Sequence, residues 1–395
     1  MRSTLRELLF EARPGFACGQ EDPNGIFQFR MHNVSKSSDL LLSKRRRIPL
    51  NSHRRLDEYY VSPGDVLFNA TNSPDNTGKS ILVPKLDEPA VYSNHFFRLR
   101  TNPAQLDSKY LWRYLQWQFR RGAFLGLTRQ WVNQATISRE DLLGLKLNPP
   151  NLDSQRRITA VLDEADAIRA KRRTQLAHLD ELPRALFHDM FGALNADAIV
   201  SGLAANTKGA IRTGPFGSQL LHDEFVDSGI AVLGLDNVVG NTFGWAKRRF
   251  ITPEKYAKLR RYTVHPGDVL ISIMGTVGRC VVVPDDIETA INTKHICAIT
   301  LDHEIAHPAF VRAAFLWHPA SRRHLAHETK GAIMAGLNMG IIKKMPLPLP
   351  PLNDQQKFAE RTAAIHDERD RVAHALQADD ELFEALQHRA FRGEL

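Results

Sequence analysis

An internal repeat constrains this chain more than any other feature of its sequence. Residues 61–68 read Val-Ser-Pro-Gly-Asp-Val-Leu-Phe and residues 264–271 read Val-His-Pro-Gly-Asp-Val-Leu-Ile, so six of the eight positions are identical. A repeat this far apart predicts two copies of one fold, and therefore a function that needs two similar units. The other matched positions are Asn33-Val34 with Asn237-Val238, Gly78 with Gly278, His95 with His295, Trp117 with Trp317, and Gln155 with Gln355.

Length and composition indicate two or three globular domains. Apolar residues make up 43% of the 395 residues, which is enough for a separate core in each copy. No apolar run reaches the roughly eighteen residues of a transmembrane helix, and the N-terminus lacks the pattern of a signal peptide. Cys18, Cys280 and Cys297 lack the paired spacing of a disulfide framework or a zinc site. We therefore expect a cytoplasmic protein without a bound metal.

The charge balance points to a polyanionic partner. The net charge is +8 and the pI is near 9.4, and excess Lys and Arg attract polyanions whatever the fold. A single basic cluster is often only a solvated surface, but clusters occur in both halves beside polar residues that can reach base edges, which favours DNA over an acidic membrane. The clusters are Lys44-Arg45-Arg46-Arg47, Arg54-Arg55, Arg120-Arg121, Lys247-Arg248-Arg249, Arg260-Arg261 and Arg322-Arg323.

Each half is expected to combine a mixed globular part with a long charged helix, which makes the fold class α+β. Short β-type runs and turn residues fill each globular part, and a helix with 3.6-residue apolar spacing closes it, near residues 110–117 and 310–317. The expected segments are a first globular domain over 1–150, a central helix over 151–192, a second globular domain over 193–351 and a C-terminal helix over 352–395. The expected strands are Ile26–Met31, Asp65–Asn69, Ser80–Val83 and His95–Leu99, repeated as Ile230–Leu233, Asp268–Ile273, Cys280–Val283 and His295–Thr300.

The two long helices are expected to pack on each other in antiparallel fashion. Their apolar residues alternate three and four apart, which is the pattern of a coiled coil with one partner helix. The alternative is two independent helices that each lie on their own domain. Pro183 is expected to kink or end the first helix, which leaves roughly 29 residues, or ~44 Å, as a spacer. The expected seam residues are Ile158, Val161, Ala165, Ile168, Leu179, Leu182 and Leu186 in the first helix, and Phe358, Ile365, Val372, Ala375, Leu382 and Leu386 in the second.

Two patterns that resemble catalytic motifs are incomplete. Residues 74–80 end in Gly-Lys-Ser, but Ser73 stands where a phosphate-binding loop needs its first glycine. Residues 148–151, Asn-Pro-Pro-Asn, lack the aromatic ring of the base-stacking loop of amino-methyltransferases, and we interpret them as a helix-entry turn. No glycine-rich loop for S-adenosylmethionine and no nuclease carboxylate cluster stands out. The chain is therefore not expected to be an enzyme by itself.

Several short phrases occur in the same order in both halves of the sequence. Through these phrases the chain resembles the specificity subunit of type I restriction-modification systems over essentially its whole length. In the second half the phrases run from residues 211–218 through 234–238, 266–270 and 275–278 to the proline-rich exit at 346–352. In the first half they are looser and rest on Gly15-Phe16, residues 32–34, 63–68, 94–95, 137–138 and 152–158. The first half lacks the Gly-Pro-Phe-Gly-Ser phrase of residues 214–218, and we place Phe16 in register with Phe216.

The resemblance implies two target-recognition domains, related by a pseudo-two-fold axis and separated by the antiparallel helices. Each domain would bind one half of a split DNA site. Two modification subunits would carry S-adenosylmethionine and methylate adenine, and restriction subunits would use ATP and Mg to translocate and cleave DNA. The resemblance implies no catalytic residue, cofactor or metal on this chain.

The candidate DNA contacts lie in the polar and glycine-containing loops of both halves. In the first half they are Arg30, Asn33, Asn69 and Lys79. In the second half they are Arg212, Thr213, Gly217, Ser218, Asn237, Arg279 and Lys294.

Two other function classes remain open at this point. A DNA methyltransferase or nuclease that acts alone would need a cofactor or catalytic fingerprint that the sequence does not display. A coiled-coil scaffold without nucleic acid would not explain the basic charge on both globular halves.

Overall fold

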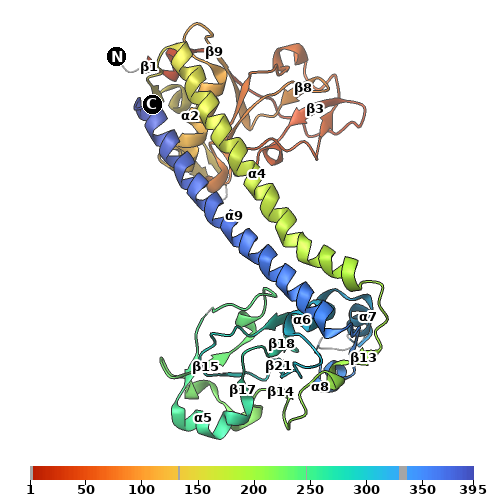
Figure 1. Cartoon of the computed structure of the whole chain (residues 1–395). Helices are drawn as coiled ribbons and strands as arrows, with labels where there is room; N and C mark the ends of the chain where they lie inside the picture. The colour runs from red at the N-terminus through yellow and green to blue at the C-terminus, as the bar shows by residue number, and fades with distance from the viewer. Residues whose placement is uncertain (1–2, 132–133, 246, 329–335) are drawn as a thin grey trace. The chain divides into compact units, whose positions relative to one another are not determined.

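The computed structural model describes residues 3–131, 134–245, 247–328 and 336–395. The chain forms two compact units (Figure 1). Unit 1 comprises Met1–Arg172 and Ala375–Leu395, and unit 2 comprises Arg173–His374. Each unit contains its own sheets and helices, which confirms the α+β class and the duplicated organisation expected from the repeat.

The sheets of unit 1 are small and mostly antiparallel, and β3 pairs with β8 in parallel. A four-stranded sheet has the order β2-β9-β5-β7, and a three-stranded sheet has the order β4-β3-β8. The strands of unit 1 are β1 (Ser3–Thr4), β2 (Leu9–Pro14), β3 (Ile26–Phe29), β4 (Arg47–Ile48), β5 (Val66–Asn69), β6 (Thr71–Asn72), β7 (Ser80–Leu82), β8 (Ala90–Tyr92), β9 (Phe96–Thr101), β10 (Arg129–Trp131), β11 (Gln134–Thr136) and β12 (Lys146–Leu147). The short helices of unit 1 are α1 (Leu5–Leu8), α2 (Ser108–Arg120) and α3 (Arg139–Leu143).

Unit 2 repeats this arrangement with the sheet orders β14-β21-β18-β19 and β16-β15-β20-β17. Its parallel pair is β15 with β20, which matches β3 with β8 in unit 1. The strands of unit 2 are β13 (Ala198–Ile199), β14 (Ile211–Thr213), β15 (Ile230–Leu233), β16 (Phe250–Ile251), β17 (Thr263–Val264), β18 (Val269–Ser272), β19 (Cys280–Val282), β20 (Ala290–Asn292), β21 (Ile296–Ile299) and β22 (Pro346–Leu347). Its short helices are α5 (Pro253–Leu259), α6 (Pro308–Trp317), α7 (Pro319–Glu328) and α8 (Met339–Lys343).

The repeated Pro-Gly-Asp phrase forms the same turn in both units. Gly64 and Gly267 have φ of 91° and 78°, a left-handed conformation that favours glycine. The aspartate that follows is buried and accepts a backbone hydrogen bond within the turn, from Ser62 N to Asp65 Oδ2 in unit 1 and from His265 N to Asp268 Oδ2 in unit 2. The phrase therefore has the same role in both units: it ends a turn and puts a carboxylate in a buried position. A buried carboxylate must be paired.

The matched glutamines at the start of the long helices also perform one task twice. Gln155 donates to the carbonyls of Gln105 and Pro150 and accepts from Asp107 N. Gln355 donates to Ile305 O and Pro350 O and accepts from His307 N. Both side chains have no exposed surface. Each glutamine therefore connects the entry of a long helix to the N-terminus of the domain's own helix, α2 or α6.

The first long helix, α4 (Leu152–Phe191), continues through Pro183. Of the two alternatives expected for Pro183, an end of the helix at this residue is therefore wrong, and so is a spacer that stops near Leu182. The second long helix, α9, spans Leu352–Arg392. A proline removes one helical hydrogen-bond donor but does not prevent a helix that tertiary packing stabilises on both sides.

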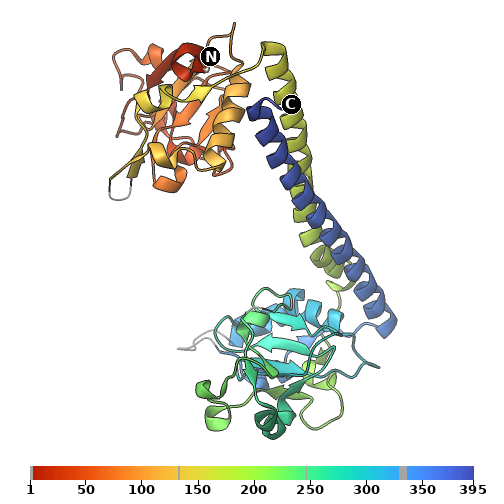
Figure 2. The same cartoon turned by 90° about the vertical axis from the view of Figure 1, so that its left-hand side faces the viewer.

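The two long helices pack against each other within each unit, which excludes two independent helices. In unit 1 the beginning of α4 lies beside the end of α9 (Figures 1 and 2), and Arg169 Nε donates to Asp380 Oδ1 at 2.5 Å. In unit 2 the end of α4 packs on the beginning of α9, where the rings of Phe187 and Phe358 have centroids 5.8 Å apart. The pairing is therefore antiparallel, as expected.

The seam of the first helix lies one position away from part of the expected one. Val161, Ile168 and Leu182 are 44–46% exposed, whereas their neighbours Leu162, Arg169 and Pro183 are buried. The guanidinium carbon of Arg169 lies 4.2 Å from the centroid of the Phe383 ring. An arginine stem covers apolar surface as well as a leucine does, so a pattern that treats arginine as a polar interruption misplaces the stripe.

Among the residues that the structure describes, no helix is long and apolar enough to cross a membrane.

Candidate nucleic-acid interface

Four loops of unit 2 meet at the ends of its central strands. A hollow of about 540 Å³ is lined by residues from the loop after β14, the turn after β15 and the connection between β20 and β21, together with Arg249 before β16. The hairpin between β18 and β19 joins them, because a Cβ on Gly275 would lie 2.8 Å from Leu235 Cδ1. Strand ends that meet at one edge of a fold are a common place for a binding site. We therefore take this hollow as the candidate site of unit 2.

The matched loops of unit 1 are joined in the same way. Arg30 Nη2 donates to Cys18 O at 2.5 Å, Lys79 Nζ donates to Val34 O at 2.8 Å, and Asn69 Nδ2 donates to His95 O at 3.1 Å. These three bonds link the loop after β2, the turn after β3, the β5–β7 hairpin and the β8–β9 connection. Both units therefore present four loops from equivalent places in the fold.

Glycine is required where the first of these loops crosses its neighbour. A Cβ on Gly15 would lie 2.2 Å from Ser93 O, and a Cβ on Gly214 would lie 2.0 Å from Asn292 O. The strand register pairs Arg13 with Arg98 and Arg212 with Ala298, so Gly15 corresponds to Gly214. Phe16 consequently matches Pro215, and the register of Phe16 with Phe216 is wrong by one residue. Phe16 is buried, whereas Phe216 is 48% exposed.

Four of the predicted contacts in unit 1 have their side chains occupied inside the domain. Asn33 accepts from Arg30 N and donates to the carbonyls of Leu41 and Lys44. Asn69 and Lys79 are buried, and burial lowers the pKa of the Lys79 ammonium. Burial is also the main reason for the lowered pKa of Arg30, followed by repulsion from Arg46. These placements argue against base contacts from Asn33, Asn69 and Lys79, and they leave Arg30 only partly accessible.

Two of the predicted contacts in unit 2 are also internal. Arg212 is 9% exposed, and its Nη2 donates to Asp268 Oδ2 at 2.5 Å while its Nη1 donates to Thr300 Oγ1 at 2.9 Å. Asn237 accepts from Gly234 N and donates to Gly244 O, both at 2.8 Å. Arg212 therefore neutralises the buried aspartate of the Pro-Gly-Asp turn, and Asn237 closes the turn after β15. The structure assigns both residues to the fold rather than to a DNA surface.

The remaining predicted contacts of unit 2 lie at or near the surface. Gly217, Ser218 and Lys294 are exposed, and Thr213 and Arg279 are half-buried. Gly217 and Lys294 line the hollow. The structure therefore brings these two residues together at the candidate site.

All three arginines of residues 44–47 are paired with carboxylates. Arg45 pairs with Asp87 and Glu88, Arg46 with Glu21, and Arg47 with Glu88. A paired guanidinium contributes less to a positive surface than sequence counting suggests. The exposed members of the first-half clusters are Lys44, Arg54, Arg55, Arg120 and Arg121, and Arg55 pairs with Glu58.

Asp236 and Arg249 line the candidate site of unit 2 and were missed as site residues. The Nη1 group of Arg249 donates to Asp236 Oδ1 at 3.2 Å. Asp236 stands inside the Gly-Leu-Asp-Asn-Val phrase and Arg249 inside a basic cluster. In the sequence, only the Gly-Leu-Asp-Asn-Val phrase pointed to Asp236. The pairing of Asp236 with Arg249 depends on the strand register.

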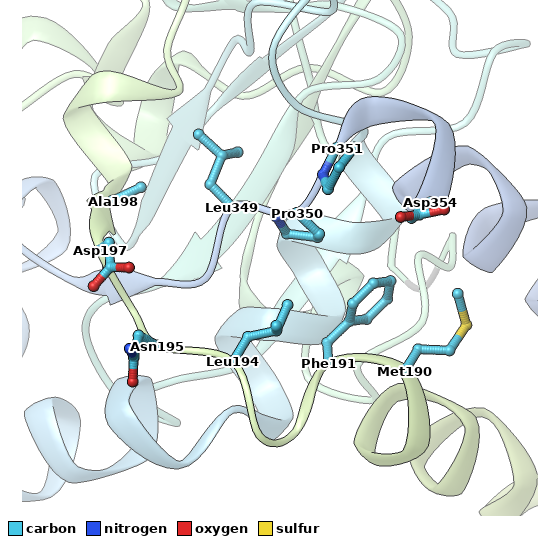
Figure 3. A pocket seen from close by; sticks show the side chains of 10 residues that line it. All are labelled: Met190, Phe191, Leu194, Asn195, Asp197, Ala198, Leu349, Pro350, Pro351 and Asp354. Carbon is cyan, nitrogen blue, oxygen red and sulfur yellow. The ribbon is translucent and has the colours of Figure 1, made fainter.

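A second hollow of unit 2 lies where α4 ends and α9 begins (Figure 3). Its lining includes Phe191, Leu349 and Pro350, with two carboxylates, Asp197 and Asp354, and no lysine or arginine. A polyanion would be repelled from such a lining. This hollow is therefore not the nucleic-acid site, although its volume of about 670 Å³ exceeds that of the loop site.

The family model described as the type I restriction modification DNA specificity domain matches this chain twice, at residues 47–178 and 237–369. The chain is 22% identical over 386 residues to a putative type I restriction enzyme MjaX specificity subunit from Methanocaldococcus jannaschii, a match that covers 92% of this chain and 86% of that protein. It is 28% identical over 151 residues to the type I restriction enzyme EcoBI specificity subunit of Escherichia coli, covering 37% of this chain and 31% of that protein.

Solved structures resemble the fold over the full length. The type I restriction-modification S subunit from M. genitalium matches with a TM-score of 0.57 and 14% identity, covering 99% of this chain and 96% of that chain. A chain from a study of assembly and conformational transition in the type I system matches with a TM-score of 0.65 and 16% identity, covering 100% and 98%.

Proposed function

Because this chain belongs to the family of type I restriction modification DNA specificity domains, we propose that its two units read the two halves of a split DNA site. The observation that carries this proposal is the double occurrence of the domain, with equivalent loops gathered in each unit. One copy would suffice to read one continuous site. Two divergent copies suit a site of two blocks with different sequences.

The charge and the loop chemistry support DNA as the ligand. The net charge of +8 supplies the sequence-independent attraction to phosphates. Exposed Lys294 and Ser218 and half-buried Arg279 can donate to phosphates or base edges at the loops of unit 2. Phosphate contacts position the protein, and a few base contacts then select the sequence.

The same proposal assigns the chemistry to other chains. Modification subunits would bring S-adenosylmethionine and transfer the methyl group to adenine, and restriction subunits would bring ATP and Mg. This chain would act in the cytoplasm and would supply no catalytic residue. The relatives support this assignment, because they are named specificity subunits of restriction enzymes.

Reconstitution with the modification subunits tests the function. The complex should methylate adenines at one split sequence, mapped by single-molecule sequencing of methylated DNA. The chain alone should transfer no methyl group. A chimera that replaces residues 1–150 by the matching part of a relative should change one block of the site and preserve the other, because each unit has its own loops. Methylation by the chain alone, or a chimera that alters both blocks, would refute the proposal.

The long helices are proposed to set the gap between the two blocks. Seven extra residues lengthen a helix by ~10 Å, which corresponds to about three base pairs of B-DNA. Because α4 packs on α9 within both units, the insertion must be made in both helices, beside Arg172 and beside His374. The methylation map should then show the same two blocks with a longer gap. If the insertion variant folds and its methylation map shows an unchanged gap, the long helices do not set the spacing of the two blocks.

A further inference from the structure

One arginine at the loop site of unit 2 is held by a carboxylate and still has free donors. The Nη1 group of Arg249 is bonded to Asp236 Oδ1, and among the described residues no other acceptor engages this guanidinium. The side chains of Arg249 and Asp236 are 35% and 26% exposed. Arg249 is therefore accessible from the hollow while its orientation is restrained.

The carboxylate depends on this arginine for its neutralisation. Asp236 Oδ2 is buried and has no hydrogen-bond partner among the described residues. A partly buried carboxylate with one oxygen that lacks a hydrogen-bond partner needs a neighbouring cation to offset the cost of its burial. Asp236 therefore fixes the guanidinium in place and is not itself free to move away.

Glycine at position 234 makes room for the pair. A Cβ on Gly234 would lie 2.5 Å from Arg249 Nη1 and 2.7 Å from Asp236 Oδ1. The backbone of Gly234 is extended, with φ of −116° and ψ of −172°, so an alanine could adopt it. What glycine provides here is space for two side-chain ends, rather than an unusual backbone conformation.

The matched place in unit 1 is built differently. The backbone bonds Gln28 N to Arg46 O and Val232 N to Arg249 O, each 2.9 Å, show that Arg46 is the counterpart of Arg249. Arg46 is occupied by Glu21 through Nε at 2.8 Å and by Gly19 O through Nη2 at 2.7 Å. Among the described residues, Arg46 is therefore engaged through two of its nitrogens, whereas Arg249 is engaged through one.

We propose that Arg249, positioned by Asp236, reads a guanine in the half of the site that unit 2 recognises. This inference rests on the proposed function and adds the identity of one recognised base. Arginine donates two parallel hydrogen bonds to guanine O6 and N7 in the major groove. A phosphate is disfavoured at this position because the Asp236 carboxylate would repel it, whereas O6 and N7 are uncharged acceptors.

Three variants of the methyltransferase complex test the assignment by methylation mapping. Arg249→Gln should lower the preference for guanine at one position of one block by about ten- to a hundredfold and shift it toward adenine, which glutamine can read. Arg249→Lys should retain the charge but lose most of the guanine preference, because an ammonium has no planar fork. Gly234→Ala should weaken the preference at the same position by displacing the guanidinium.

The control is Arg248→Gln, since Arg248 pairs with Glu288 at 2.8 Å outside the hollow. This variant should leave every base preference unchanged. Unchanged preferences in the Arg249 variants, or changes spread over both blocks, would overturn the Arg249 assignment while the proposed function stands. A wild-type complex that methylates no defined sequence would overturn both.

Discussion

The two units differ where the short helix of each domain meets the long helices. In unit 1, Arg113 of α2 is 3% exposed and pairs with Asp163 at 2.8 Å and with Asp166 at 2.9 Å, both on α4. The matched positions of unit 2 hold Ala313, Ala363 and His366.

In unit 2 a groove of about 700 Å³ lies at this place, and His366 and Arg312 are part of its lining. Arg312 donates to the backbone carbonyl of Asn241. The paired charges of one copy are therefore replaced by open space in the other.

This difference separates two kinds of contact in a duplicated fold. The glutamine bonds at the helix entries are preserved, because they connect backbone groups whose positions are common to both copies. The charged pairs between the short helix and α4 are not preserved, because side chains on packed helices can be exchanged once the backbone is held. The pair between the two long helices does recur, as Arg169 with Asp380 in unit 1 and as Arg369 with Asp180 in unit 2. The copies therefore share their turns, their caps and one ion pair between the long helices, and they differ where the short helix meets α4 or α9.

The largest expected effect comes from the contact that both units retain. Gln155→Leu and Gln355→Leu each leave one buried N–H and two carbonyls without their partner, which should cost about 3–5 kcal/mol in the affected unit. Hydrogen-exchange mass spectrometry, read separately for peptides of α2 and α6, measures the loss of protection in each unit. Gln175→Leu on the exposed face of α4 is the matched control. A strong effect in only one unit would show that the two glutamines are not equivalent.

A smaller and unequal effect is expected at the contact that only unit 1 has. Arg113→Ala leaves Asp163 and Asp166 partly unpaired, and we expect a cost of about 2–3 kcal/mol because both carboxylates are still about a third exposed. Arg312→Ala should cost about 1 kcal/mol, since it removes a single bond to a backbone carbonyl. Urea unfolding followed by hydrogen exchange in each unit compares the two variants. Equal costs would contradict the view that the seam of unit 1 depends on charge.

The smallest expected difference is a response to pH. Burial lowers the pKa of His295, His307, His318 and His366 in unit 2, and Arg312 adds to the effect at His366. In unit 1, among the described residues, it lowers the pKa of His95. A histidine of lowered pKa remains neutral in the folded state while the unfolded chain takes up a proton near pH ~6.5. Its contribution to stability is therefore complete above that pH and is lost as the pH falls toward the folded pKa.

Unit 2 should consequently lose more stability than unit 1 between pH 7.5 and 5.5. Hydrogen exchange corrected for the intrinsic pH dependence of the amide rate provides the comparison. His366→Gln should reduce the difference between the units. A larger loss in unit 1 would mean that groups other than these histidines dominate the acid response.

The sequence by itself determined the features that depend on local chemistry and on repetition. The Pro-Gly-Asp turns follow from residues that allow only a few backbone conformations. The long helices follow from apolar residues that alternate three and four apart, and the number of domains follows from matched phrases. The family resemblance was visible for the same reason, since it consists of such phrases in a particular order.

The tertiary structure decided which polar side chains are available to a ligand. Asn69, Lys79 and Arg212 look in the sequence like DNA contacts, but the fold uses them to satisfy carbonyls and a carboxylate that burial would otherwise leave unpaired. Their partners lie far away along the chain, so no local pattern reveals the bonds. Arg249 is the converse, because strand pairing places it beside Asp236 and leaves its donors open. Burial and pairing are properties of the assembled chain, and they determine which of many similar residues can act.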